Sequence, residues 1–253
     1  MWTIGIDSGS TMCKSVLFKD GELVKLNIMR TGWNPLQSAQ TSLSVLLAAG
    51  GISRESTRVI ATGYGRESIT FADKHFTEIT CHGLGADFLE PGTGGVIDIG
   101  GQDSKVIRLE NGRVADFLMN DKCAAGTGRF LAMACDAIGI ELTEIDNFVN
   151  PHESVHITSM CTVFAESEII SLLAASTDRS QILAGVLESI AQRARQMVAR
   201  VGFEPSKPLL MTGGLAQSRM LVDAISKASG FEVKTHKYAQ FAGAIGACLK
   251  GLS

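Results

Sequence analysis

One pattern occurs twice in this sequence and limits the possible folds: a strand, a turn that contains glycine, and a second strand. Asp7 ends a buried apolar run and is followed by a Gly-Ser-Thr turn and a second strand. The pattern restarts at Asp98, 91 residues further along the chain. At this offset, without a gap, Ile6, Asp7, Gly9, Lys14 and Gly21 match Ile97, Asp98, Gly100, Lys105 and Gly112.

Most of these matched residues are polar or lie at turns, so the composition of buried strands alone does not explain the repeat. Two similar hairpins that arose by chance are the alternative. We favour a duplicated βββαβα unit. Predicted strands cover 2–7, 13–18, 23–29, 58–62, 95–98, 104–109, 114–119, 207–211 and 232–235, and predicted helices cover 36–49, 79–89, 161–173, 178–200 and 217–229, with two more from 127 and 241.

Strands and helices alternate throughout, which predicts an α/β protein with mixed sheets and two lobes. The first lobe is expected over residues 1–93 and the second over 94–253. The last helix, about 241–253, is expected to pack back on the first lobe.

Charge and hydropathy exclude several classes of function. The 23 basic and 26 acidic residues are nearly balanced, so we expect neither nucleic-acid binding nor attraction to an anionic membrane. No apolar run approaches the ~20 residues that span a bilayer. The N-terminus lacks a basic segment and reaches Asp7 early, unlike a signal peptide. We therefore expect a cytoplasmic protein.

Three turns that contain glycine follow predicted strands and favour a phosphate site. Glycine lets backbone N–H groups approach phosphate oxygens that a Cβ would push away. Neither a Walker A motif nor GxGxxG is present. The candidate nucleotide contacts are Gly9, Ser10 and Thr11 in the first turn, Gly100 and Gly101 in the second, and Gly213, Gly214 and Ala216 in the third.

Four side chains in these turns are candidates for hydrolysis. Asp7 and Asp98 end their strands, where a carboxylate can hold Mg²⁺ through water. Gln102 and Asp103 could each orient an attacking water, and the sequence does not decide between them.

The chain has six cysteines, without a CxxC pair or a four-cysteine array. Cys123 lies just before one predicted helix and Cys161 at the start of another, and helix N-termini favour a thiolate. From the residues alone a metal cluster shared across a twofold axis, a redox dithiol and inert thiols all remain open. Cys13, Cys135 and Cys248 are expected in the core, and Cys81-His82 is expected to be structural or at the surface. His152 and Met160 are not expected to bind metal.

The three turns together resemble those of the actin/Hsp70/sugar-kinase ATPase superfamily. Residues 7–11 and 98–103 resemble its two phosphate motifs, and 212–216 its adenosine motif. The resemblance implies a duplicated RNase H-like fold in which two lobes close around ATP and Mg²⁺.

Four longer segments resemble a narrower family. Residues 61–66 (ATGYGR), 96–103 (VIDIGGQD), 120–130 and 161–168 are similar to activators of 2-hydroxyacyl-CoA dehydratases and to the related benzoyl-CoA reductase ATPase subunits. This resemblance implies a homodimer with one [4Fe-4S] cluster, held by residues matching Cys123 and Cys161 of each subunit. It also implies ATP-driven transfer of one electron, received from a ferredoxin or flavodoxin, to a partner dehydratase.

Three alternatives compete with that expectation. The first is the ATPase subunit of a benzoyl-CoA reductase-like system. The second is a small-molecule kinase of the same superfamily, which needs neither Cys123 nor Cys161. The third is a nucleotide-binding scaffold without catalysis. The sequence does not name the partner's substrate, because the partner binds it.

Overall fold

The computed structural model describes residues 1–150, 153–158 and 161–252. Its described strands form two five-stranded sheets, ordered β3-β2-β1-β4-β5 and β10-β9-β6-β7-β8. The first sheet contains β1 (Trp2–Ser8), β2 (Met12–Lys19), β3 (Glu22–Arg30), β4 (Thr57–Thr62) and β5 (Lys74–His75). The second contains β6 (Gly95–Ile99), β7 (Ser104–Glu110), β8 (Arg113–Asn120), β9 (Leu209–Thr212) and β10 (Val233–Lys234).

The two sheets share one topology. In each, the opening strand pairs antiparallel with the next strand and parallel with a later one: β1 with β2 and β4, and β6 with β7 and β9. The register places Asp7 opposite Lys14 and Asp98 opposite Lys105. The predicted duplicated α/β fold with mixed sheets is therefore confirmed.

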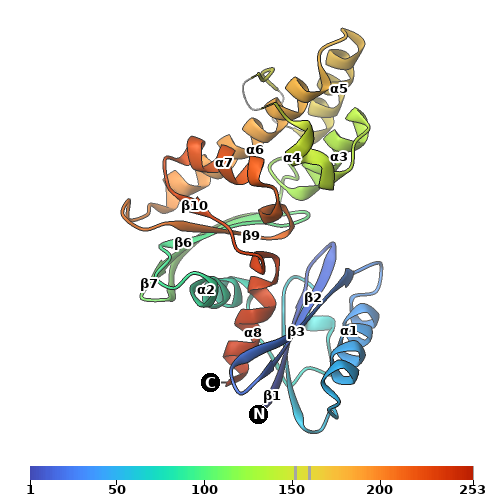
Figure 1. Cartoon of the computed structure of the whole chain (residues 1–253), viewed down its shortest axis with the longest axis vertical. Coiled ribbons are helices and arrows are strands. Elements are labelled where there is room, and N and C mark those ends of the chain that lie inside the picture. Colours follow the sequence, from blue (N-terminus) through green and yellow to red (C-terminus); the bar gives the residue numbers. More distant parts are fainter. Residues whose placement is uncertain (151–152, 159–160, 253) are drawn as a thin grey trace.

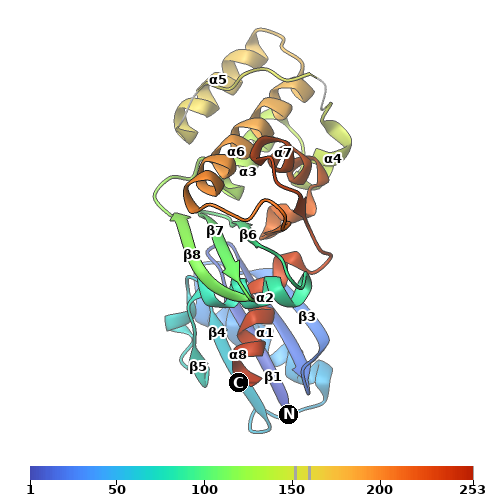
Figure 2. The ribbon, with the colours of Figure 1, turned by 90° about the vertical axis from the view of Figure 1, so that its left-hand side faces the viewer.

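Two helices lie between the sheets (Figures 1 and 2). α8 (Ala242–Leu252) packs on the first sheet, where Ile245 and Cys248 join Val16 and Phe18 in one apolar cluster. α2 (Glu78–Leu89) packs on the second sheet, with Ala86 in a cluster of β6, β7 and β9 residues. The division into lobes at residue 93 stays a prediction.

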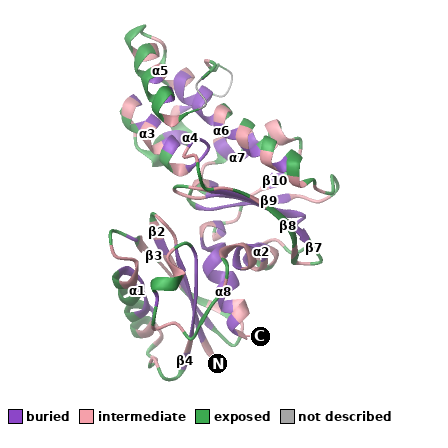
Figure 3. Ribbon diagram, turned by 180° about the vertical axis from the view of Figure 1, so that it is seen from behind, coloured by how far each residue is buried: buried purple, intermediate pink, exposed green. Residues whose placement is uncertain are grey.

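The remaining helices cover the outer faces. α1 (Pro35–Gly50) covers the first sheet, and α6 (Arg179–Val201) and α7 (Arg219–Ser229) cover the second. α3 (Gly128–Ile138), α4 (Ile145–Phe148) and α5 (Thr162–Ala174) lie beyond them, and α5 lies farthest from the first sheet. α5 is the outermost and is largely exposed (Figure 3).

The sequence predicts most element bounds to within a residue or two, and the differences have local causes. β9 begins at Leu209 rather than at 207, because Pro208 has no N–H for the ladder. α7 begins at Arg219 rather than at 217, because the Ser218 side chain caps it by accepting from the Leu221 amide. β5 and α4 were not predicted, since two and four residues show no periodicity.

No helix within the described ranges is long and apolar enough to cross a membrane.

Candidate functional site

Two buried aspartates lie at equivalent places in the two sheets. Asp7 near the end of β1 is 3% exposed, and Asp98 near the end of β6 is 2% exposed. Each faces a lysine on the neighbouring strand: Lys14 Nζ lies 4.0 Å from Asp7 Oδ2, and Lys105 Nζ lies 3.3 Å from Asp98 Oδ2. The sequence repeat thus becomes a repeated pair of opposite charges.

Lys105 is the centre of an acidic cluster. Its Nζ lies 2.8 Å from Asp103 Oδ2 and 3.6 Å from Glu78 Oε2, in addition to Asp98. Burial alone would lower the pKa of Lys105, but these three carboxylates raise it above its usual range, so the ammonium stays charged. Sequence reasoning matched Lys14 and Lys105 in the repeat without assigning either a role, and missed Glu78.

The same cluster keeps Asp98 ionised. Burial alone would raise the pKa of Asp98, but the neighbouring His82, Lys105 and Lys14 and a hydrogen bond from Thr212 hold it below its usual range. Glu78 behaves differently, because burial raises its pKa despite Lys105. Lys105 therefore lies between Asp98, whose pKa is lowered, and Glu78, whose pKa is raised.

His82 was missed as a site residue. It is 4% exposed, so a surface role is excluded, and it faces both aspartates from α2. Its Nδ1 lies 3.3 Å from Asp98 Oδ1, and its Nε2 lies 3.9 Å from Asp7 Oδ2. The only sequence signal was the Cys81-His82 pair, which does not reveal what the helix packs against.

The three glycine turns come together beside these charges. Gly9 and Thr11 are tied to Thr31, which donates its hydroxyl to the Gly9 carbonyl (2.7 Å) and its amide to the Thr11 carbonyl (2.9 Å). A Cβ on Gly101 would collide with the Thr11 hydroxyl, so the first and second turns touch. Ser10 lies partly exposed between Gly9 and Thr11.

The third turn meets the second at Asp98. Thr212 donates its hydroxyl to Asp98 Oδ1 (2.7 Å). Gly213 has a φ of +85° and has no room for a Cβ beside the Ile99 carbonyl. Gly214 borders open space, whereas Ala216 is buried. Glycine therefore lets the backbone turn tightly here and leaves room above the turn.

The two candidates for positioning water differ in their surroundings. Gln102 is exposed, whereas the Asp103 carboxylate pairs with Lys105 and the Asp103 carbonyl accepts from the Gly100 amide (2.9 Å). Neither observation assigns the attacking water, so both remain predictions.

The second turn is hydrogen-bonded to the start of α3. The Gly128 amide donates to the Gly100 carbonyl and the Arg129 amide to the Gly101 carbonyl, both at 2.8 Å. These amides belong to the first turn of the helix and have no partner within it. Two backbone hydrogen bonds therefore connect the second glycine turn directly to α3.

The cysteines divide into two sets. Cys161 is exposed and is the N-cap residue of α5, whereas Cys123 is partly exposed and lies five residues before α3 begins. Burial raises the pKa of Cys13 and of Cys81 to about 12, raises that of Cys135 to about 11 and raises that of Cys248 well above its usual value. Cys13, Cys135 and Cys248 are core residues as predicted. His152 and Met160 lie outside the described residues.

The described residues contain no group of three or more His, Cys, Asp or Glu side chains that could hold a metal ion. A [4Fe-4S] cluster with four thiolate ligands therefore fits Cys123 and Cys161 only if a second copy supplies two more.

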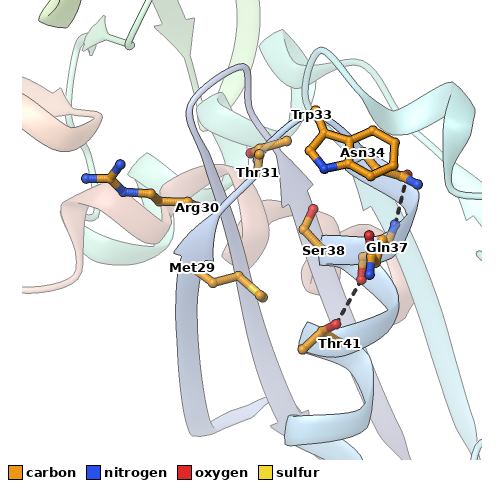
Figure 4. Close-up of a pocket in the computed structure, with 9 residues that line it drawn as sticks. Met29, Arg30, Thr31, Trp33, Asn34, Gln37, Ser38 and Thr41 are labelled. Carbon is orange, nitrogen blue, oxygen red and sulfur yellow. Dashed lines mark hydrogen bonds between the residues drawn. The ribbon is translucent and has the colours of Figure 1, made fainter.

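A separate shallow pocket of about 200 Å³ lies where β3 meets α1 (Figure 4). Its lining includes Thr31, which binds the first turn, and Trp33, which is 89% exposed. The pocket adjoins the phosphate turns but contains none of the charged groups described above.

Paired sheets, glycine turns and buried aspartates define a two-lobe ATPase of the actin and sugar-kinase type. A Streptomyces griseus ROK family glucokinase has the same fold, with a TM-score of 0.62 at 13% identity over 99% of each chain. The narrower assignment comes from the sequence: residues 4–251 match the BadF/BadG/BcrA/BcrD ATPase family, and the chain belongs to it.

Two kinds of relative agree with this assignment. The (R)-2-hydroxyglutaryl-CoA dehydratase activating ATPase of Acidaminococcus fermentans is 42% identical over 98% of this chain and 96% of its own length. A benzoyl-CoA reductase subunit from Thauera aromatica is 31% identical, over 98% of this chain and 92% of its own. The expected resemblance to both groups is confirmed.

Solved structures give the same result. Component A of the Acidaminococcus fermentans (R)-2-hydroxyglutaryl-CoA dehydratase superposes with a TM-score of 0.93, at 41% identity over 100% of both chains. The activator of 2-hydroxyisocaproyl-CoA dehydratase from Clostridium difficile, with bound ADPNP, gives 0.92 at 39% identity, over 99% of this chain and 94% of its own.

Proposed function

We propose that this protein hydrolyses ATP to drive transfer of one low-potential electron to a 2-hydroxyacyl-CoA dehydratase-type partner. The electron comes from a [4Fe-4S] cluster shared by two copies of the chain. The observation that carries the proposal is that Cys161 is exposed and Cys123 partly exposed, while the other four cysteines are buried. The names of the relatives that match over nearly the whole chain support the partner class.

The glycine turns supply the nucleotide site. Gly9, Ser10, Thr11, Gly100 and Gly101 line the phosphates, and Gly213, Gly214 and Ala216 lie at the adenosine. The amides of Gly9 and Gly100 donate to carbonyls within their own turns, so the backbone donors to phosphate come from Ser10, Thr11 and Gly101. Asp7 and Asp98 hold hydrated Mg²⁺. Asp98 suits this role because its pKa is held below the usual range, and the ionised carboxylate is the form that attracts a cation.

Two copies of the chain complete the cluster site. Cys123 and Cys161 of each copy provide the four thiolates, and the cluster, when bound, supplies a low-potential electron. The face of α5 beside Cys161 exposes Val163, Phe164 and Ile170, which is unusual for one short helix. A second copy of the chain would cover this apolar face in a homodimer.

The nucleotide site acts on the cysteine region through α3. The Gly100 and Gly101 carbonyls bind the first amides of α3, and Cys123 lies in the segment between β8 and that helix. A change at the γ-phosphate moves the second turn, and the segment containing Cys123 moves with it.

The proposal also includes the cellular setting. A ferredoxin or flavodoxin donates the electron in the cytoplasm, and the acceptor is a dehydratase or a benzoyl-CoA reductase-like enzyme. The donor and the acceptor both exchange an electron with the cluster, so both bind at the same exposed cysteine region.

Two measurements on anaerobically purified protein test this function. Phosphate should be released from ATP without any added acceptor, which distinguishes an ATPase from a kinase. Cys123→Ser and Cys161→Ser should each lose the visible iron–sulfur absorbance and still bind ATP, whereas Cys135→Ser should keep both. ATP turnover that requires a sugar or an acid, or a Cys161→Ser protein that keeps its absorbance, would refute the proposal.

A further inference from the structure

The start of α7 is capped by a residue that belongs to another helix. Asp146 of α4 accepts three hydrogen bonds there, from the Ser218 hydroxyl (2.6 Å), the Arg219 amide (2.8 Å) and the Met220 amide (3.3 Å). Between 72 and 74 residues separate Asp146 from these donors along the chain. The contact therefore joins two distant segments, which lie side by side in Figure 1.

The local cap of α7 accounts for only part of its exposed amides. Ser218 accepts the Leu221 amide on its side chain (3.3 Å) and the Val222 amide on its carbonyl (3.1 Å). The first four N–H groups of a helix have no partner within it, and Asp146 binds the two that Ser218 leaves. A carboxylate is also favoured at this end of a helix by the helix dipole.

This second cap lies at the end of the third glycine turn. The turn begins after Thr212, which donates to the buried Asp98, and continues through the short helix Gly214–Gln217 to Ser218. The residues proposed to lie at the adenosine are therefore held at one end by Asp98 and at the other by Asp146.

α4 belongs to the segment of the chain that contains Cys123 and Cys161. Ile145 of α4 is buried in the same apolar core as Ile138 of α3 and Ala165 of α5, so these three helices pack as one unit. The unit is attached to the nucleotide turns at two places. The start of α3 binds the second turn, and Asp146 binds the end of the third.

We propose that Asp146 is a positioning residue that couples the third glycine turn to the helices beside the cysteines. A nucleotide that orders the third turn also holds α4 through this carboxylate. The reverse holds as well, because coupling between two sites is reciprocal, so loss of the contact weakens nucleotide binding. This inference rests on the proposed ATPase function and adds a second connection to the one through α3.

The alternative is a helix cap that contributes stability and nothing else. Asp178, the N-cap residue of α6, is the matched control, because its carboxylate also accepts two amides at a helix start, those of Ser180 and Gln181. Both of these hydrogen bonds lie at the start of its own helix, and both aspartates are exposed. Asp146→Ala and Asp178→Ala should therefore lose similar amounts of stability.

The test is calorimetric titration of ADP, together with hydrogen exchange measured by mass spectrometry with and without ADPNP. In the wild type, ADPNP should slow amide exchange at 213–222 and also at 145–148. Asp146→Ala should bind ADP about 2- to 30-fold more weakly. At saturating ADPNP it should keep the slower exchange at 213–217 and lose it at 145–148. Asp146→Asn, which retains one acceptor, should recover part of both effects, and Asp178→Ala should resemble the wild type.

An Asp146→Ala protein with the wild-type affinity for ADP and the wild-type response at 145–148 would overturn the inference. A wild-type protein in which ADPNP leaves exchange at 145–148 unchanged would overturn it as well. If Asp146→Ala does not fold, the asparagine variant still decides. Failure of the proposed function looks different, because the wild-type protein would then release no phosphate from ATP.

Discussion

Burial determines how reactive each cysteine is. The pKa values of Cys13, Cys81 and Cys135 are raised to about 11–12 by burial, so these thiols stay protonated at pH 8. Thiolate is the reactive form. We expect iodoacetamide at pH 8 to label two sites per iron-free native chain, Cys123 and Cys161, and peptide mass spectrometry would identify them. Rapid labelling of Cys81 or Cys248 would contradict the packing described here.

Lys105 is expected to be important for stability. Lys105→Met leaves Asp98, Asp103 and Glu78 close together without their shared cation. Removing one partner from a buried charge cluster costs about 3–5 kcal/mol. Urea unfolding should show this loss, whereas Lys207→Met should cost at most about 1 kcal/mol, because the pair with Glu204 is exposed. Equal losses in the two variants would mean that the cluster contributes little.

The sequence predicted some of these residues and not others for a physical reason. Asp7 and Asp98 were found because they end buried strands in a repeated pattern. His82 was not, because the neighbours of a helical residue depend on which sheet the helix covers. Contacts of that kind are set by packing between distant segments, and no local pattern records them.

The close packing of helix α2 against helix α8 depends on a glycine. A Cβ on Gly246 would collide with the Cys81 carbonyl, so the helices approach closely there. Gly246→Ala should lower the free energy of unfolding by about 1–3 kcal/mol through overpacking. Gly50→Ala is the matched control, because its Cβ would meet only the flexible ends of Leu17 and Ile52. Calorimetric melting should show a drop in Tm for Gly246→Ala alone, and an unchanged Tm would contradict the close crossing.

The elements themselves were largely predictable, but their partners were not. The apolar spacing of Ile182, Val186, Ile190, Ala194 and Val198 predicted one buried face of α6, and all five are buried. The same kind of pattern could not show that α2 packs on the second sheet and against α8. Periodicity identifies the buried face of a helix but not what covers it.

We expect the fluorescence of Trp33 to report closure of the two lobes around the nucleotide. This side chain is 89% exposed, and the neighbouring Thr31 is bonded to the first phosphate turn. In a Trp2→Phe protein, where Trp33 is the only tryptophan, a non-hydrolysable ATP analogue should shift the emission to the blue. A Trp33→Phe protein should show no such shift. Identical spectra with and without saturating nucleotide would contradict closure around this loop.

In the proposed function two copies of the chain share one cluster, and ATP hydrolysis drives electron transfer from it. The decisive measurement is iron and sulfide analysis of anaerobically purified protein, together with the native mass of the same sample. We expect a dimer with about four iron and four sulfide ions, the content of one [4Fe-4S] cluster held by two cysteines from each chain. An iron-free protein, or iron bound to a monomer, would contradict it.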